Sequence, residues 1–339
     1  MKKILLIATG GTIVSRYGKD GLSPKITAEE LLQYIEDFSS FCTIDTYQLF
    51  NLDSTNISPY HWLKMASLIE EKYDEYDGFV ICHGTDTMAY TAAALSYLIQ
   101  NNRKPVIVTG SQKPIDLAVT DAKTNLNDSI RIACDDRAYG TNIVFSGNLI
   151  NGTRAKKDRT KSYNAFSSIN YPTLATIQDD RIFFYLDDKD KLKDEVKFYH
   201  SMDPRVVLLK LIPGIDCNIL KALQNRCDAV IIESFGVGGL PEYSGTEFND
   251  IVKEYLDNGK IVVMATQVTH EGSDMSIYEV GSVIKSEYEL PESYDMTLES
   301  TVAKTMWALS ESSSLAEFKE LFYRPVNHDL MYNAGGKQL

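Results

Sequence analysis

Short apolar runs with almost no polar alternation constrain the fold of this chain more than any other feature. They are Lys3–Ala8, Gly78–Cys82, Pro105–Thr109, Asn142–Phe145, Val206–Leu211, Ala229–Glu233 and Lys260–Ala265. A strand buried on one face alternates apolar and polar residues, whereas a parallel strand covered by helices on both faces stays apolar throughout. The runs therefore predict parallel β-strands buried between two helical layers.

Helical patterns separate these runs. They cover Ala28–Asp37, a segment that starts at Ser58-Pro59, Thr87–Gln100, Asp121–Ala133, Asn218–Gln224, Thr246–Leu256 and Thr297–Leu309. The first of them follows a capping box, in which Thr27 is followed three residues later by Glu30. Strands that alternate with helices in this way predict an open, mostly parallel α/β sheet with helices on both faces.

A highly charged stretch divides the chain. Residues 187–195 read DDKDKLKDE and contain a single apolar residue, which is typical of an exposed connection between domains. A chain of 339 residues also has the length for about two domains. We expect a larger N-terminal domain at residues 1–190, a linker at 191–205 and a smaller C-terminal α/β domain at 206–339.

The charge balance excludes several classes of partner. The chain has 34 Lys and Arg residues against 47 Asp and Glu residues, a net charge of −13. Such a chain repels phosphate groups, so we expect it to bind neither nucleic acids nor anionic membranes.

Apolar runs stay short of the ~18 residues that a membrane span needs. The run that follows Met1 ends at Thr9, too early for a secretory signal.

The cysteines indicate a reducing compartment. They are Cys42, Cys82, Cys134, Cys217 and Cys227, an odd number at wide spacings with no CxxC pair. This pattern is typical of free thiols in the cytoplasm. The sequence also contains no GxxxxGK[ST] loop, HExxH helix or GxSxG turn. We therefore expect neither a metal nor another cofactor.

Three of the apolar runs end in turns that combine glycine with a hydroxyl. These turns are Thr9-Gly10-Gly11-Thr12, His83-Gly84-Thr85-Asp86 and Thr109-Gly110-Ser111-Gln112. Ligands of open α/β sheets bind beyond the carboxyl ends of the strands, where a hydroxyl can act as a nucleophile and nearby N–H groups can stabilise an oxyanion. Threonine and aspartate after a strand are also ordinary helix caps. The residues alone leave both interpretations open.

Two longer stretches resemble a known family. Residues 7–13, IATGGTI, and residues 80–91, VICHGTDTMAYT, resemble the signature segments of the L-asparaginases. Asp53-Ser54-Thr55, Thr109–Gln112, Arg154–Phe166 and Ser234–Gly239 also follow the order and spacing of that family. The resemblance spans essentially the whole chain and favours the bacterial cytosolic type I branch. It implies a larger amino-terminal α/β domain that carries the active site.

The resemblance also implies a set of site residues. Thr12 is the first catalytic threonine, and Thr85, Asp86 and Lys157 form a second catalytic group. The substrate is expected to contact Gly11, Asp53, Ser54, Thr55, Gly84 and Ser111, with Ser54 on its α-carboxylate. In this scheme Lys157 activates Thr85 or a water held by it, and Asp86 orients the lysine and attracts the substrate ammonium. Without the resemblance, Lys157 is more typical of a solvated basic segment.

This sequence departs from the family at several positions. Leu22 stands where well-known members carry a loop tyrosine, and Tyr17 in the same loop is a candidate to assist Thr12. Gly239 stands where many members carry an asparagine that is supplied across the subunit interface. Glu233 stands where an arginine is expected, and Val268 stands where an allosteric relative has a cysteine. We therefore expect weak or absent cooperativity towards asparagine.

The resemblance implies an L-asparagine amidohydrolase that works through an acyl-threonine intermediate, with weak glutaminase activity, as a homodimer or homotetramer in the cytoplasm. A tRNA-dependent amidotransferase subunit shares the fold. It carries an extra amino-terminal domain, whereas this chain begins directly at its first predicted strand. A non-catalytic amino-acid-binding or sensor protein is the alternative from another class. His83 lacks an evident carboxylate partner and is more typical of a buried structural residue than of a general base.

Overall fold

The structure, a computed structural model, describes residues 1–18, 21–186, 189, 192–241, 248–277, 288 and 290–331, and for residues 17–18 and 21–24 the backbone alone. The chain divides into two compact units, Met1–His200 and Ser201–Leu339. The boundary between the two units lies within residues 191–205, where the linker is expected.

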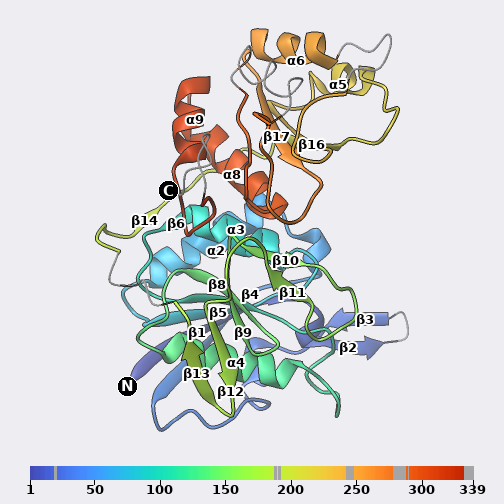
Figure 1. The fold of residues 1–339 in the computed structure, drawn as a ribbon. Helices are drawn as coiled ribbons and strands as arrows, with labels where there is room; N and C mark the ends of the chain where they lie inside the picture. Colours follow the sequence, from blue (N-terminus) through green and yellow to red (C-terminus); the bar gives the residue numbers. More distant parts are fainter. Residues whose placement is uncertain are drawn as a thin grey trace. The chain divides into compact units, whose positions relative to one another are not determined.

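An eight-stranded sheet forms the centre of the first unit (Figure 1). Its strands are β1 (Lys2–Gly10), β4 (Cys42–Leu52), β5 (Gly78–Cys82), β7 (Val106–Thr109), β8 (Thr141–Phe145), β9 (Asn148–Asn151), β12 (Ala175–Gln178) and β13 (Arg181–Phe184). Their spatial order is β13-β12-β9-β8-β7-β5-β1-β4. Neighbours are parallel from β4 through β1, β5 and β7 to β8, and antiparallel from β8 to β13.

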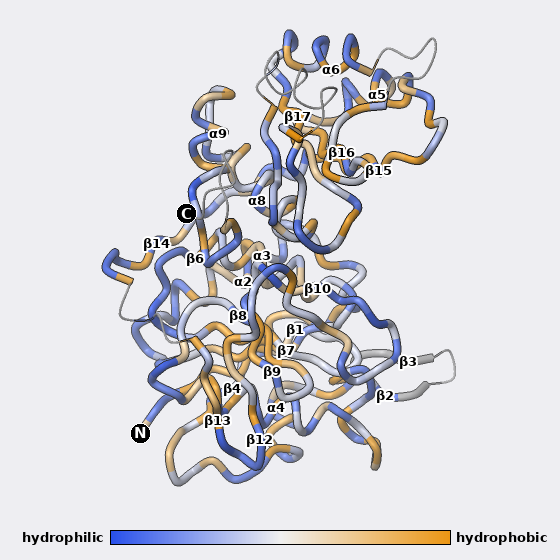
Figure 2. Tube along the Cα trace, in the orientation of Figure 1, coloured by the Kyte–Doolittle hydropathy of each residue, from blue (hydrophilic) through white to orange (hydrophobic). Residues whose placement is uncertain are grey.

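Helices cover both faces of this sheet. They are α1 (Ala28–Leu31), α2 (Pro59–Lys72), α3 (Met88–Leu98) and α4 (Ala122–Cys134). Figure 1 shows α4 on one side and α2 and α3 on the other. Leu126 and Ile130 of α4 share a hydrophobic cluster with Leu6 and Val80 of the strands. Ile81 points to the opposite face and is also fully buried. Figure 2 shows the hydrophobic residues gathered along these central strands.

Three smaller strand pairs lie outside the large sheet in the first unit. The hairpin of β2 (Ser15–Gly18) and β3 (Gly21–Pro24) follows a short 3₁₀ turn, η1 (Thr12–Val14). β10 (Ala155–Lys157) pairs antiparallel with β11 (Phe166–Ser168). β6 (Ile99–Gln100) pairs antiparallel with β14 (Lys197–Phe198). A second 3₁₀ turn, η2 (Ser54–Asn56), follows β4.

The second unit contains a smaller parallel sheet. Its strands β15 (Val206–Lys210), β16 (Ala229–Ser234) and β17 (Ile261–Thr266) lie in that order. The helices among its described residues are α5 (Asn218–Leu223), α6 (Phe248–Asp257), α8 (Leu298–Glu311) and α9 (Leu315–Tyr323). Phe248 and Tyr255 of α6 pack on Val262 of β17. Lys304 and Asp329 form a completely buried ion pair of 2.6 Å.

The predicted fold class is confirmed, since a mostly parallel sheet with helices on both faces is joined to a smaller α/β unit. One expected helix is too long. The segment predicted at Ala28–Asp37 is helical only over Ala28–Leu31, although its capping box is present. Beyond it, the amide of Tyr34 bonds to the carbonyl of Leu31, three residues back, so the chain continues as tight turns. In the described part of the chain, no helix is long and apolar enough to cross a membrane.

Candidate active site

The turns that the sequence singles out lie side by side because their strands are neighbours in the sheet. Ala8 of β1 pairs with Cys82 of β5, and Cys82 pairs with Thr109 of β7. On the other side of β1, Gly10 pairs with Leu52 of β4. Four parallel strands therefore end at one edge of the sheet, and the chain leaves each of them through one of the candidate segments.

Two glycines allow these turns to touch. Gly11 has a φ of +81°, and a β-carbon at this position would lie 2.3 Å from the amide nitrogen of Gly84. A β-carbon at Gly84 would lie 2.6 Å from the hydroxyl oxygen of Ser54. Real β-carbons do not approach other atoms so closely, so only glycine fits at either position. The turns after β1, β5 and β4 are therefore in direct contact.

Lys157 reaches this edge from a distant part of the sequence. Its position is set by β10, where Lys157 pairs with Phe166 of β11. Its Nζ donates to the hydroxyl of Thr85 at 2.8 Å and to Oδ1 of Asp86 at 2.6 Å. The side chain of Lys157 is 16% exposed and that of Asp86 is 60% exposed. A cation, a buried hydroxyl and a solvent-facing carboxylate thus form one hydrogen-bonded group.

Gln112 is a neighbour of this group that the sequence reasoning missed. The Thr85 hydroxyl donates weakly to Oε1 of Gln112 at 3.4 Å, and Nε2 of Gln112 donates to the carbonyl of Ser162 at 3.1 Å. Gln112 also holds the turn in place, because its backbone N–H donates to the carboxylate of Asp121 at 2.8 Å. The available signal was its position in the third glycine turn, directly after Ser111.

The expected carboxylate-binding segment forms η2. The carboxylate of Asp53 caps this turn by accepting hydrogen bonds from the backbone N–H of Thr55 at 2.9 Å and from the Thr55 hydroxyl at 2.8 Å. Both residues are exposed, whereas Ser54 between them is 3% exposed. Thr87 also fixes this turn, because its hydroxyl donates to the carbonyl of Ser54 at 2.8 Å. The hydroxyl of Ser54 itself makes no hydrogen bond to a described residue.

The remaining expected residues differ in what their hydroxyls do. Thr12 begins η1 and is half-buried, and its hydroxyl has no hydrogen-bond partner among the described residues. Ser111 is fully buried, and its hydroxyl donates to the carbonyl of Lys113 at 2.5 Å, so it is already engaged. The side chain of Tyr17 lies outside the described residues. The backbone register of the hairpin does pair Tyr17 with Leu22.

His83 and Cys82 lie next to the site but are not activated for catalysis. Burial lowers the pKa of His83 to about 4, so the ring is neutral at pH 7. Its Nδ1 is 2.7 Å from the Gly84 carbonyl and therefore carries the proton, which leaves Nε2 to accept from the Thr91 hydroxyl at 2.9 Å. Burial also raises the pKa of the Cys82 thiol to about 12. Neither residue is set up as a base or a nucleophile.

The geometry is suited to acyl transfer. Thr12 offers a hydroxyl without a described partner, and Lys157 lies against a second hydroxyl on Thr85. The described residues contain no group of three or more His, Cys, Asp or Glu side chains placed to hold a metal ion.

Two family models match this chain. The model described as "Asparaginase, N-terminal" matches residues 3–190, and the model described as "Glutaminase/Asparaginase C-terminal domain" matches residues 205–322. The L-asparaginase of Thermococcus kodakarensis is 37% identical over 329 residues, which cover 96% of this chain and 98% of that protein. A glutamyl-tRNA(Gln) amidotransferase subunit of Pyrococcus furiosus is 32% identical over 331 residues, or 94% of this chain and 74% of that protein.

Solved structures show the same likeness. The thermostable L-asparaginase from Thermococcus kodakarensis superposes with a TM-score of 0.89 at 35% identity, over 98% of this chain and 100% of that chain. L-asparaginase I from Vibrio cholerae superposes with a TM-score of 0.83 at 30% identity, over 97% of this chain and 99% of that chain.

Proposed function

This chain belongs to the asparaginase family, and on that premise we propose that it is an L-asparagine amidohydrolase. The reaction converts L-asparagine and water into L-aspartate and ammonia. The observation that carries the proposal is the contact of the Lys157 amine with both the Thr85 hydroxyl and the Asp86 carboxylate. A lysine amine in contact with both a hydroxyl and a carboxylate can provide the proton transfers that amide hydrolysis requires.

The substrate's two charged ends have matching groups. Asp86 is mostly exposed at the edge of the sheet and offers a carboxylate to the α-ammonium of the substrate. Ser54 is buried beside the Gly84 backbone and has a hydroxyl available for the α-carboxylate. An anionic group opposite the ammonium selects an amino acid over a simple amide, because an ammonium taken out of water must be paired. Asp53 and Thr55 support the Ser54 turn.

In the first step the Thr12 oxygen attacks the side-chain amide carbon of asparagine. The C–N bond breaks, the Thr12 proton leaves with the nitrogen as ammonia, and an acyl-threonine ester remains. Tyr17, at the position paired with Leu22, assists the transfer of that proton.

In the second step water attacks the ester. Thr85 holds this water and Lys157 accepts its proton, which is then returned to the Thr12 oxygen. In the structure Lys157 donates two hydrogen bonds, so it must first pass one proton to Asp86 or to solvent before it can accept another.

Two other functions make different predictions. A sensor on this fold would bind asparagine without releasing ammonia. The second candidate is favoured by the relatives named as glutamyl-tRNA(Gln) amidotransferase subunits, of which the Pyrococcus furiosus protein is 32% identical. A protein of that kind would prefer L-glutamine to L-asparagine. An asparaginase with weak glutaminase activity shows the reverse preference.

The test is ammonia release by the purified full chain from L-asparagine and from L-glutamine. Thr12→Ala is compared with wild type, and Thr43→Ala, an exposed threonine on β4, is the matched control. We expect asparagine turnover to fall by several orders of magnitude in Thr12→Ala alone. Turnover that persists would move the nucleophile to Thr85. Binding of asparagine without turnover in wild type would favour the sensor, and a preference for glutamine would favour the amidotransferase.

We further propose that the chain belongs to the type I branch, acts in the cytoplasm and assembles as a homodimer or homotetramer. The free cysteines support a reducing compartment, because Cys42, Cys82, Cys217 and Cys227 are buried as thiols and Cys134 is half-buried. Light scattering at micromolar concentration measures the assembly. A monomer that remains fully active would contradict it.

A further inference from the structure

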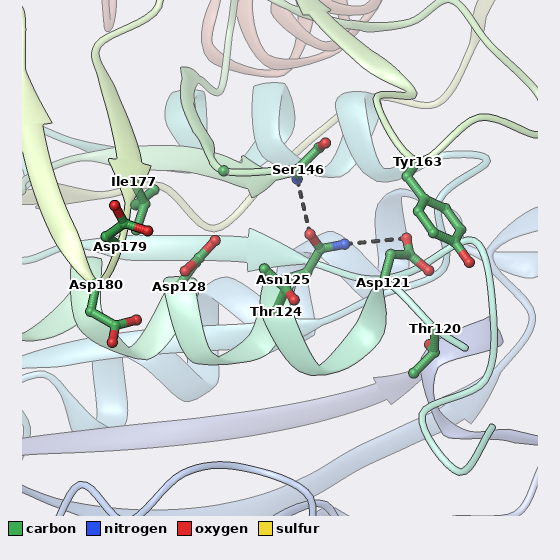
Figure 3. Close-up of a pocket in the computed structure, with 11 residues that line it drawn as sticks. Thr120, Asp121, Thr124, Asn125, Asp128, Ser146, Tyr163, Ile177, Asp179 and Asp180 are labelled. Carbon is green, nitrogen blue, oxygen red and sulfur yellow. Dashed lines mark hydrogen bonds between the residues drawn. The ribbon is translucent and has the colours of Figure 1, made fainter. Parts of the chain in front are cut away.

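A pocket of about 510 Å³ opens in the first unit between α4 and the turns that join β8 to β9 and β12 to β13 (Figure 3). Its lining residues are Thr120, Asp121, Thr124, Asn125, Asp128, Ser146, Gly147, Tyr163, Ile177, Asp179 and Asp180. None of them belongs to the proposed catalytic or substrate-binding set. Four of the lining residues are aspartates, and among the described residues no lysine or arginine lines the pocket.

Turn geometry explains two of these aspartates. Asp179 and Asp180 are the central residues of the β12–β13 hairpin, and both have positive φ, +47° and +62°. Two-residue hairpins of this kind favour Asp, Asn and Gly for backbone reasons alone. Asp121 is also accounted for, because its carboxylate accepts the amides of Gln112 and Lys113.

Asp128 has no such explanation. It lies on α4, is 7% exposed, and makes no hydrogen bond to a described residue. In Figure 3 its carboxylate rises from the helix towards the turn that carries Asp179. The nearest cation along α4 is Arg131, one helical turn away. Its guanidinium group forms ion pairs with Asp180, at 3.1 Å, and with Glu36. This cation is therefore already paired with two other carboxylates.

A buried carboxylate without a hydrogen bond is costly unless a cationic ligand joins it. A compact metal ion does not fit, because the described residues hold no group of three ligands around one point. A zwitterionic amino acid does not fit either, because none of the described lining residues is a cation that could meet its carboxylate. What remains is an organic ammonium ion, which needs a single close carboxylate and tolerates an apolar wall.

The shape of the pocket adds a requirement of length. Asp121 and Asp128 mark the two ends of a lining that follows α4 for seven residues, or about 10 Å at 1.5 Å per residue. Ile177 adds apolar surface to the walls, and the Tyr163 ring adds aromatic surface that the ammonium group of Lys113 already faces at 5.7 Å. We propose that this pocket binds a linear aliphatic polyamine, with one ammonium group on Asp128 and a second towards Asp121.

The experiment is calorimetric titration of the full chain with spermidine at pH 7.5 in physiological salt, which screens exposed charges. Butylamine, with one ammonium group, is the second probe. Asp128→Asn removes the buried charge with little change in shape, and Asp74→Asn removes an exposed charge elsewhere in the first unit as the matched control. We expect one saturable spermidine site, weakened at least tenfold in Asp128→Asn and less than twofold in Asp74→Asn. Butylamine should bind at least tenfold more weakly than spermidine.

A pH series checks the assignment to Asp128. Burial raises the pKa of Asp128 to about 6, opposed by Arg131 and assisted by Asp180 and Glu36. The other acidic groups of the pocket are Asp121, Asp179 and Asp180. Burial also raises the pKa of Asp121. Spermidine affinity should therefore fall several-fold more in wild type than in Asp128→Asn between pH 7.5 and 5. The proposal is overturned if wild type shows no saturable site, if Asp128→Asn binds like wild type, or if butylamine matches spermidine. An Asp128→Asn thermal melt that stays cooperative shows that the variant is folded.

Discussion

Replacing His83 by glutamine tests how the turn before Thr85 is held. Glutamine is uncharged at all relevant pH values, and its amide can donate to the Gly84 carbonyl and accept from the Thr91 hydroxyl, as the neutral imidazole does. The substitution therefore removes the ability to take up a proton and keeps the pattern of hydrogen bonds. Because the ring is fully buried, the effect on stability is not diluted by solvent.

The magnitude follows from the shifted pKa. An unfolded histidine has a pKa of 6.5, and burial lowers that of His83 to about 4 in the folded chain. Between these pH values His83 binds a proton in the unfolded chain but stays neutral in the folded chain, so the free energy of unfolding falls as the pH falls. At 1.36 kcal/mol per pKa unit the loss totals about 3 kcal/mol by pH 4, of which about 2 kcal/mol is lost by pH 5.

The assay is urea unfolding of wild type and His83→Gln at pH 7 and pH 5. We expect the stability difference between them to shift by about 2 kcal/mol in favour of the variant at pH 5. Asp128→Asn is the control of opposite sign. The pKa of Asp128 is raised to about 6, so between pH 3.8 and about 6 the folded chain binds a proton that the unfolded chain does not. The free energy of unfolding of wild type therefore rises relative to that of Asp128→Asn as the pH falls.

Two results would refute the reasoning about His83. If the stability difference between wild type and His83→Gln is the same at both pH values, the folded chain protonates His83 as readily as the unfolded chain does. If the variant abolishes turnover while remaining as stable as wild type at pH 7, His83 takes part in the chemistry rather than holding the turn.

Three further changes address the proposed reaction. Lys157→Met should lower kcat by about 10²–10⁴-fold in ammonia release, because the group that accepts the proton is gone; an unchanged kcat would rule out that role. Gly84→Ala places a methyl group 2.6 Å from the Ser54 hydroxyl, so the KM for asparagine should rise more than kcat falls, and an unchanged KM would remove Ser54 from the carboxylate site. Tyr17→Phe should lower kcat, and a wild-type value would exclude Tyr17 from the first step. The rate should depend hyperbolically on asparagine concentration, whereas a sigmoidal curve would contradict the expectation drawn from Glu233 and Val268.

The sequence predicted the central strands because strands buried on both faces must be apolar throughout. It did not predict β4, an edge strand whose residues after Cys42 are half-buried or exposed, in rough alternation. The glycine turns could be recognised locally, since each directly follows its strand. The contact of Lys157 with Thr85 could not, because it joins residues 72 positions apart and depends on the pairing of β10 with β11. The family resemblance, rather than spacing, pointed to Lys157.

The acidic pocket shows a second limit of sequence reasoning. An aspartate within an amphipathic helix is normally taken as part of the solvated face, and Asp128 is indistinguishable from such a residue in the sequence. Its burial arises from the β12–β13 turn, which lies about 50 residues further along the chain and lines the pocket with Asp179 and Asp180.

The dependence of Lys157 on its strand partner has a consequence for synthesis. A chain emerging from the ribosome exposes Thr12 and Thr85 long before residues 166–168, which pair with the strand that carries the lysine. Until that third segment has been made and has folded back, the earlier threonines lack the amine. If the chain is the proposed amidohydrolase, a partly translated chain is therefore expected not to hydrolyse asparagine while its own synthesis still requires that amino acid.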